Sequence, residues 1–290
     1  MNKVNINDLV VVKPGNWGRK ALALFLAACV IFIANAFRTG DIAWQYVGEY
    51  LFADPVLYGV LNTIIMTFCA MILGVALGIL AAVMRLSDNT VLQSVALGYI
   101  WLFRGLPTLL LLLLWFNLAL IFPHVSLFGF FPIKTIDIMT PFFAALCGLG
   151  IQQGAYTAEV VRAGILSIDR GQLEAAQSVG MTKRKAMLRI ILPQAMRVIV
   201  PPIGNETIGM VKLTSLASVI QYAEVLRSVE NVYYNNSRVI ELLIVAAIWY
   251  MAIVTVLSVA QIYVERYFSK GWHNRSQKNT QSPVVEEAVA

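Results

Sequence analysis

Charged residues are scarce in this 290-residue sequence, at 13%, whereas hydrophobic residues make up 59%. Soluble domains are about a quarter charged and about half apolar. The composition therefore excludes an ordinary soluble protein and predicts an all-α, polytopic membrane protein. Cysteine is also rare, and Cys29, Cys69 and Cys147 lie far apart in apolar stretches. With only two isolated histidines, His124 and His273, neither a disulfide framework nor a metal site is expected.

Motifs for nucleotide and hydrolytic chemistry are absent. The dipeptide Gly-Lys occurs nowhere, so the sequence lacks the P-loop that binds nucleotide phosphates. The patterns H-E-x-x-H and G-x-S-x-G are missing as well. We therefore expect no enzyme activity and no cofactor in this chain, and any ATP and Mg²⁺ used to drive it would bind another polypeptide. A convincing internal repeat is also lacking, which disfavours an inverted-repeat secondary transporter.

Six apolar stretches are each close to or longer than the ~20 residues that cross a bilayer. They are 21–37, 56–84, 91–122, 141–163, 197–216 and 239–264. Apart from Arg104 and Lys212, which lie within spans, the Lys and Arg residues fall mostly on one side, 16 against 4. The positive-inside rule then places both termini in the cytoplasm. One alternative concerns the first stretch, because Ala34-Asn35-Ala36 resembles a signal-peptide cleavage site. We favour an uncleaved first helix, since the tail before it is long for a signal peptide.

The chain is expected to have three regions. Residues 1–55 comprise a cytoplasmic tail, the first transmembrane helix and an external segment. Residues 56–265 form a five-span unit with short connections, apart from the long cytoplasmic loop 164–194. Residues 266–290 are a polar cytoplasmic tail, for which we expect disorder.

Two segments of the five-span unit have distinctive compositions. Gly74 and Gly78 place two small residues on one face of the second span, where helices can approach closely. We expect this pair, the Gly74–Gly78 step, to pack against another helix of the same chain rather than to form a dimer contact. The external loop 123–140 is unusually apolar, which suits either the outer membrane surface or an external partner.

The cytoplasmic loop carries the signals of two short helices. Asp169 is suited to cap the first, 171–179, with Gln172 reaching back as in a capping box. Gly180 is suited to the left-handed conformation that ends a helix. A basic amphipathic helix follows on the inner membrane surface, and Pro193 is expected to end or kink it. The loop is either a docking element for another protein or a hairpin that merely joins two spans.

Several polar residues lie within or beside the apolar stretches. A charge at the bilayer centre costs about 2.5–3.5 kcal/mol, so such residues usually face a cavity or the inside of a bundle. Pro201 and Pro202 should also loosen the fifth span. Structural pairing between helices, or of Glu159 with Arg162, explains these residues about as well as a solute pathway. The candidate pathway residues are Glu159, Asn205, Glu206, Lys212, Thr214 and Ser215.

Three motifs together resemble the permease subunits of ABC importers of the polar amino acid (histidine/glutamine-type) family. The first is the loop string Gly171-Gln172-Leu173-Glu174-Ala175-Ala176, followed by Gly180 and Leu192-Pro193. The second is Arg104-Gly105-Leu106-Pro107, and the third is Pro201-Pro202-Ile203-Gly204-Asn205-Glu206 with Lys212-Leu213-Thr214-Ser215. The resemblance covers roughly 56–265. Residues 1–55 add one helix to the minimal pattern.

The resemblance implies a type I ABC importer-like five-helix core in a bacterial inner membrane. It implies that the loop is a coupling helix that binds a groove of an ATPase, with Gly171, Gln172 and Glu174 in contact with that subunit. Glu174 would face a basic residue of the ATPase. Ala175 and Ala176 would allow close approach, and Gly180 would shape the turn. The implied partners are two ATPase subunits, a second permease subunit (identical or paralogous), a periplasmic solute-binding protein, membrane lipid and an amino acid substrate, with no nucleic acid.

Two rival classes remain beside the importer. An ATP-independent secondary transporter or channel would use Glu159, Glu206 and Lys212 as an ion relay and need no soluble partner. A membrane enzyme would need a nucleophile or metal set, and the sequence offers no recognisable one.

Overall fold

The computed structural model describes residues 17–127 and 130–269. The start of the basic N-terminal tail, His273 and the tail beyond 269 lie outside these ranges. The chain divides into two compact units, Met1–Gln45 and Tyr46–Ala290. The first unit contains the apolar helix α1 (Trp17–Thr39), which coincides with the expected span 21–37.

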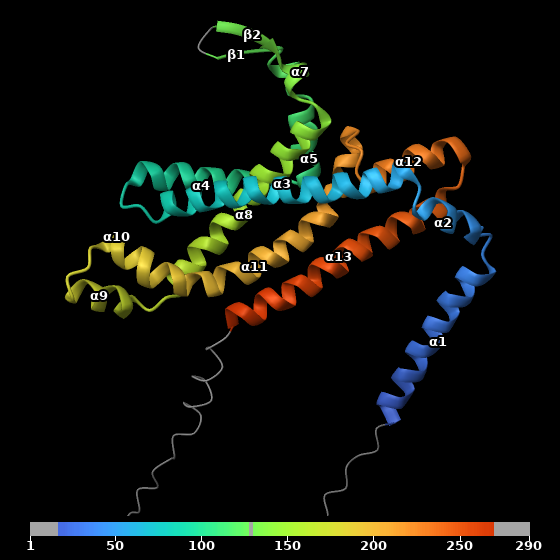
Figure 1. The fold of residues 1–290 in the computed structure, drawn as a ribbon, viewed down its shortest axis with the longest axis horizontal. Helices are drawn as coiled ribbons and strands as arrows, with labels where there is room; N and C mark the ends of the chain where they lie inside the picture. The colour runs from blue at the N-terminus through green and yellow to red at the C-terminus, as the bar shows by residue number, and fades with distance from the viewer. Residues whose placement is uncertain (1–16, 128–129, 270–290) are drawn as a thin grey trace, which may run out of the picture. The chain divides into compact units, whose positions relative to one another are not determined.

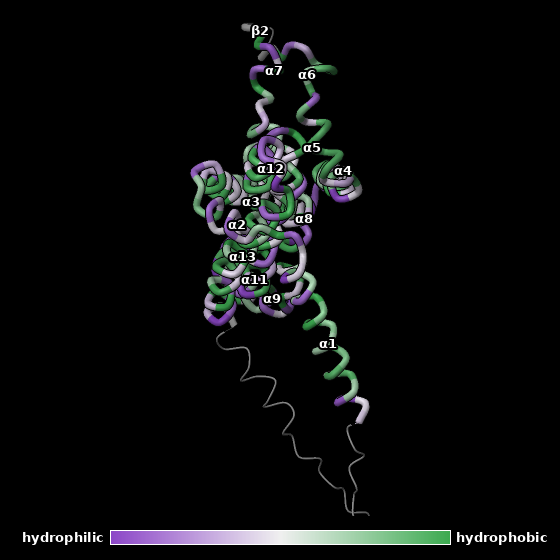
Figure 2. The backbone as a smooth tube through the Cα atoms, turned by 90° about the vertical axis from the view of Figure 1, so that its right-hand side faces the viewer, coloured by the Kyte–Doolittle hydropathy of each residue, from purple (hydrophilic) through white to green (hydrophobic). Residues whose placement is uncertain are grey.

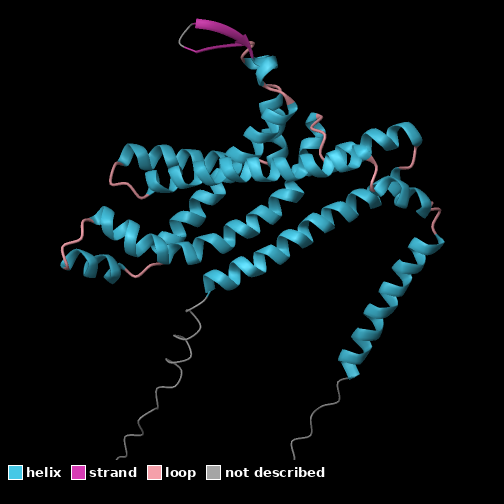
Figure 3. Cartoon of the chain, viewed as in Figure 1, coloured by secondary structure: helices cyan, strands magenta, loops and turns pink. Residues whose placement is uncertain are grey.

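The described part of the second unit is helical apart from one short hairpin (Figure 3). Strands β1 and β2 pair antiparallel, with His124 opposite Lys134, inside the expected external loop 123–140. In chain order the elements are α2 (Trp44–Leu51), α3 (Asp54–Arg85), α4 (Thr90–Gly105), α5 (Thr108–Phe116), α6 (Leu118–Ile121), β1 (His124–Leu127), β2 (Phe130–Lys134), α7 (Thr135–Ile138), α8 (Pro141–Leu166), α9 (Arg170–Ser178), α10 (Lys183–Ala186), a π-helical turn (Met187–Ile191), α11 (Leu192–Leu213), a 3₁₀ turn (Thr214–Ile220), α12 (Val225–Asn236) and α13 (Val239–Ser269).

The helices that surround α3 form the core of the second unit. α3 contacts α4, α8, α11 and α12, so it occupies the middle of the bundle (Figure 1). Its Met66 and Met71 pack with Leu112 of α5 and Leu149 of α8. A separate cluster joins α2, α12 and α13 at one end, where the fully buried Val225 belongs to α12. The loop that contains α9 and α10 lies at the opposite end (Figure 1).

Membrane-spanning helices are recognisable by length and composition. Among the described residues, four helical runs are long and apolar enough to cross a membrane: Trp17–Thr39, Asp54–Arg85, Lys183–Ile220 and Val239–Phe268. The bent pair α4–α5 adds a fifth candidate span if the two helices cross the membrane together. Figure 2 shows the largely hydrophobic length of α1, and α3 and α13 leave many large apolar side chains exposed, as a lipid solvent requires. The polytopic all-α fold is confirmed, and the count of six spans stays a prediction.

The expected span 141–163 corresponds to α8, which is polar for a spanning helix. Gln152 and Gln153 lower its hydropathy, yet they are only 5% and 6% exposed. α8 lies inside the bundle against α3, α4, α5 and α11, so its polar groups meet protein rather than lipid. Thr140 caps its first turn by accepting from the backbone N–H of Phe143.

The expected continuous span 91–122 is broken. α4 ends at Gly105 and α5 begins at Thr108 with a bend of 102°. Leu106 is extended, as the residue before a proline tends to be, and Pro107 cannot donate to a helical ladder. The carbonyl of Leu106 instead accepts a hydrogen bond from Gln152 Nε2 at 2.9 Å. A side chain of α8 therefore satisfies the backbone at the break.

Pro193 does not end the helix that precedes the fifth span. The chain stays helical from Lys183 to Ile220, and the turn Met187–Ile191 widens to the π form just before the proline. Gln194 Nε2 donates to the carbonyl of Ile190 at 2.9 Å. A π turn changes the hydrogen-bonding register, which accommodates a proline that has no amide proton. The expected surface helix is thus continuous with α11.

Candidate functional site

The first candidate site is the loop that begins with α9. Asp169 Oδ1 accepts from the backbone N–H of Gly171 at 2.7 Å, as the predicted cap requires. Gln172 does not complete the capping box. Its Oε1 accepts instead from Gln194 Nε2 at 3.5 Å, a long contact that links α9 to α11. The loop is therefore tied to the membrane helix at its base.

The end of α9 is fixed by a glycine turn. Gly180 has φ +83°, which is the left-handed conformation predicted for it. The backbone N–H of Met181 donates to the carbonyl of Ala176 at 3.1 Å, and that of Gly180 donates to Gln177 at 2.9 Å. These bonds satisfy carbonyls at the helix end. Thr182 then caps α10, where its hydroxyl accepts from Lys185 at 3.4 Å.

The predicted contact residues of α9 divide between two faces. Gly171, Gln172, Glu174 and Ala175 are exposed, whereas Ala176 is 3% exposed and packs inward. Beneath the helix is a cleft of about 530 Å³, lined by α9, Leu86 just after α3, the end of α8 and the residues that follow it, and the π turn. The exposed face is available to another protein, and the buried alanine fixes the helix to its own chain.

The second candidate site is a polar cluster between α8 and α11. Glu206 Oε2 accepts from Gln153 Nε2 at 2.7 Å and from Thr157 Oγ1 at 3.2 Å. Gln153 and Thr157 are buried, whereas Glu206 is only half-buried. No Lys or Arg of the described residues forms an ion pair with Glu206. A carboxylate inside the membrane region thus has neutral donors on one side and no cationic partner in the described chain.

Two glycines of α3 make this cluster possible. A Cβ added at Gly74 would lie 2.6 Å from Gln153 Cγ, and one at Gly78 would lie 2.6 Å from Thr157 Cβ. These distances are far below van der Waals contact, so only glycine permits this approach. The Gly74–Gly78 step therefore packs two helices of one chain, which confirms the prediction.

The remaining pathway candidates lie apart from Glu206. Glu159 forms an ion pair with Arg162, with Nη2 to Oε2 at 2.7 Å, as the structural alternative anticipated. Asn205 faces α13, where its Nδ2 lies 3.5 Å from Glu265 Oε1. The other three are at the far end of α11: Lys212 is exposed, Thr214 is fully buried and bonds to Val211, and Ser215 bonds to the carbonyl of Lys212.

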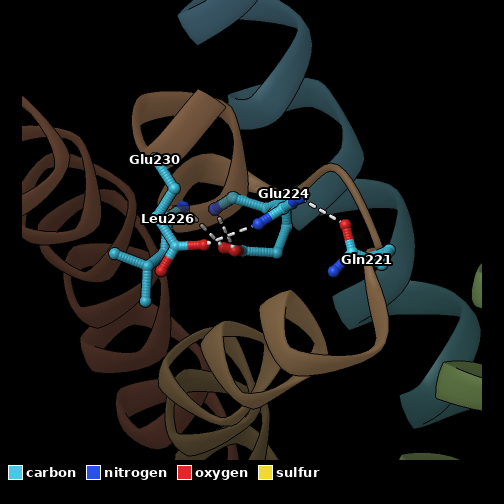
Figure 4. A network of polar contacts seen from close by, with 5 residues as sticks. Gln221, Glu224, Leu226 and Glu230 are labelled. Carbon is cyan, nitrogen blue, oxygen red and sulfur yellow. Dashed lines mark hydrogen bonds and ion pairs between the residues drawn. The ribbon is translucent and has the colours of Figure 1, made fainter. Parts of the chain in front are cut away.

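A third polar network, around Glu224, had no signal in the sequence analysis. Glu224 is fully buried and accepts from the backbone N–H groups of Leu226 at 2.9 Å and Arg227 at 2.8 Å, which caps α12. The Tyr250 hydroxyl of α13 donates to the same carboxylate. Figure 4 shows Glu224 in the middle of this network, with Leu226, Gln221 and Glu230 around it. Burial raises the pKa of the Glu224 carboxyl, although these hydrogen bonds oppose the shift.

Comparison with known proteins decides the family. Residues 74–270 match the family described as "Binding-protein-dependent transport system inner membrane component". This chain belongs to that family. It is 41% identical over 260 residues to the arginine transport system permease protein ArgU of Corynebacterium glutamicum, covering 89% of this chain and 81% of the relative. It is 36% identical over 227 residues to the L-cystine transport system permease protein TcyB of Bacillus subtilis, covering 78% and 91%.

Solved structures agree with the family. A crystal structure of an amino acid ABC transporter with histidines is 32% identical, with a TM-score of 0.69 over 78% of this chain and 99% of that one. An inward-facing structure of the MetNI methionine ABC transporter is 18% identical with a TM-score of 0.61, which shows the shared fold. The expected importer-permease fold is confirmed.

Family membership also decides between the classes considered at the start. The chain is a transmembrane permease subunit of an ABC importer, which works with ATPase subunits and a binding protein in an inner membrane. An ATP-independent transporter or a membrane enzyme does not fit this family. The permease role is consistent with the absence of a P-loop from the sequence.

Proposed function

We propose that this permease translocates an amino acid, driven by two ATPase subunits that bind the exposed face of α9. The relatives named for arginine and L-cystine transport support an amino acid solute. A second permease subunit, identical or paralogous, completes the pathway, and a periplasmic binding protein delivers the solute. Both termini lie in the cytoplasm, the side on which α9 meets the ATPases. ATP and Mg²⁺ bind those ATPases.

The observation that carries this proposal is the construction of α9. Its cap, its glycine turn and its buried Ala176 hold it as a rigid lever, and its exposed face presents Gly171, Gln172, Glu174 and Ala175. Glu174 offers a carboxylate to a basic residue of the ATPase. The helical run that follows leads through the π turn into α11 without interruption. Movement of α9 is therefore passed to the helix that bears Glu206, as a rigid-body change.

Solute passes beside α11 in this proposal. Glu206 supplies a negative acceptor for a cationic group of the solute, such as its ammonium, because the described chain provides no cation for it. Lys212 near the end of α11 contributes a polar group farther along the route, as do Thr214 and Ser215 in the turn that follows. Asn205, which faces α13, and Glu159, which pairs with Arg162 on α8, are the other candidates.

The coupling role is tested with Glu174→Lys and Gly180→Leu together, in the assembled complex reconstituted in vesicles. The charge reversal removes the acceptor, and a side chain at φ +83° costs about 1–2 kcal/mol in the turn. We expect loss of ATP-driven uptake and weaker ATPase association, with the amount of permease in the membrane unchanged. Glu49→Lys makes the same charge change on exposed α2, at the other end of the bundle, and is the matched control.

Normal uptake by the double variant would refute the coupling role. The solute is identified in the same vesicles by measuring ATPase stimulation with binding proteins loaded with L-arginine, L-cystine or L-glutamine. If none of a full set of amino acids stimulates hydrolysis or is taken up, the amino acid assignment fails.

A further inference from the structure

Gln261 of α13 lies against the weakest part of α11. Its side chain is 7% exposed, and its Nε2 donates to the carbonyl of Pro201 at 2.9 Å and to Glu265 Oε1 at 2.9 Å. Both partners are pure acceptors here, so the amide uses both of its N–H groups. A Cβ at Gly204 would lie 1.8 Å from Gln261 Oε1 and 2.6 Å from Cδ. The amide thus occupies the space that a side chain at 204 would fill.

This part of α11 cannot hold itself rigidly. Pro201 and Pro202 have no amide protons, so the carbonyls one turn earlier, at Arg197 and Val198, lose their helical donors. Prolines inside a helix and a glycine close behind them are the usual cause of bending. The hydrogen bond from Gln261 is a tie from outside the helix at this flexible point. A tie of this kind fixes how far the segment rotates about its axis.

Rotation of this segment decides where Glu206 points. Neighbouring residues of an α-helix are about 100° apart. Asn205 accordingly faces Glu265 on α13, whereas Glu206 faces Gln153 on α8. Because α11 lies between these two helices, a contact that fixes the α13 side also orients the α8 side. Among the described contacts, Glu206 receives hydrogen bonds from α8 side chains and from no side chain of α11.

We propose that Gln261 is a positioning residue for transport. Its amide locks the rotation of the Pro201–Glu206 segment, so that movement of the coupling loop turns Glu206 together with the rest of α11 instead of being absorbed at the prolines. Gly204 is the seat that admits the amide. This inference rests on the proposed function, in which α11 carries both the solute contact and the motion.

The test uses the full complex in vesicles, with whichever of L-arginine, L-cystine and L-glutamine gives the highest uptake. Gln261→Met keeps the volume and removes both donors. We expect it to lower the solute transported per ATP hydrolysed by about threefold to tenfold, the range that one hydrogen bond between membrane helices supports. The amount of assembled complex and the rate of ATP hydrolysis stay within twofold. Thr255→Val, on an exposed face of the same helix, is the matched control and leaves this ratio unchanged.

A second pair of variants tests the geometry itself. Gly204→Ala brings a methyl group onto Gln261 and should reduce the transport ratio strongly. Combined with Gln261→Ala, which vacates the space, the same glycine substitution should add little further loss. An equal effect of Gly204→Ala in both backgrounds would overturn the proposed seat.

The outcomes separate this inference from the function on which it rests. If Gln261→Met lowers complex amount, hydrolysis and uptake in proportion, the transport ratio is unchanged and the residue is only structural, which overturns the inference. If Glu206→Gln is impaired while Gln261→Met is normal, the pathway stands and the positioning role fails. Full transport by Glu206→Gln would remove Glu206 from the pathway and overturn both.

Discussion

Substitution of Gly78 by alanine tests the packing on which the membrane cluster depends. The added Cβ would lie 2.6 Å from Thr157 Cβ, 2.8 Å from Thr157 Cγ2 and 3.0 Å from the backbone nitrogen of Ala158. Two of these atoms cannot be moved by a rotamer change, since one is backbone and the other is a Cβ. α3 and α8 must therefore separate locally, and Thr157 must move relative to Glu206.

The expected change in the free energy of unfolding of Gly78→Ala follows from two opposing effects. Overpacking of a close-packed interior costs typically about 1–3 kcal/mol. The exchange of glycine for alanine inside a helix stabilises it by about 1 kcal/mol. Because the clash involves backbone, we take the upper end, and the net loss is about 2 kcal/mol. For a domain of this size the unfolding midpoint should fall by about 4–8 °C.

Gly98→Ala is the matched control for this experiment. Gly98 lies in helix α4, and a Cβ there would meet nothing within 4 Å. This variant retains the helix-propensity gain without the clash, so its midpoint should rise by about 2–4 °C. Thermal unfolding of the two purified variants in detergent, followed by tryptophan fluorescence, gives the comparison. Equal midpoints for the two variants, or a stabilised Gly78→Ala, would refute the close approach of α3 and α8.

Three further predictions concern single contacts. The pKa of Glu224 is raised by burial, so the folded state holds the proton more tightly than the unfolded state does, and the stability is greatest below the ordinary carboxyl pKa and falls as pH rises through the raised pKa. Glu224→Gln should therefore flatten the dependence of the unfolding midpoint on pH. An unchanged slope in this variant would contradict the raised pKa. Gln152→Leu leaves the carbonyl of Leu106 without its donor at the α4–α5 break, which should cost about 1–2 kcal/mol of unfolding free energy measured in denaturant, while Gln152→Glu at a pH that protonates it should cost less. Asp169→Ala removes the cap of α9 and should lower the stability of this helix by about 1 kcal/mol, so that hydrogen exchange at the α9 amides quickens about fivefold. The control Asp169→Asn should retain most of the protection from exchange. Unchanged exchange in Asp169→Ala would show that the cap is dispensable.

The loop 164–194 shows how far local sequence signals reach. The cap at Asp169, the left-handed Gly180 and the cap at Thr182 were all predictable, because each depends on residues within a few positions along the chain. At Pro193, where the helix was expected to end or kink, the local rules were wrong about the ending. A proline predicts the end of a helix only when the backbone cannot adjust its register, and here the π turn adjusts it.

The membrane sites depended on partners that no local pattern identifies. Gln153 and Thr157 bind Glu206 across 53 and 49 residues of sequence, and Gln261 reaches Pro201 across 60. The Tyr250 hydroxyl donates to the Glu224 carboxylate across 26 residues of sequence, and no motif marks that pair. Such pairs have no periodicity along the chain, so only the folded arrangement reveals them.

The amino-acid sequence by itself determined that this is a membrane protein, that the loop 164–194 contains a capped helix with a glycine turn, and that its motifs match importer permeases. Hydropathy, caps and turns depend on residues that are close in sequence. In lipid the backbone N–H and C=O groups must be hydrogen-bonded within the protein, which favours helices. The tertiary structure decided where the span 91–122 breaks, which carboxylates find donors, and that the remaining pathway candidates lie apart from Glu206. These outcomes depend on how closely separate helices approach, and the distance between α3 and α8 is set by glycines whose partners lie some 80 residues farther along the chain.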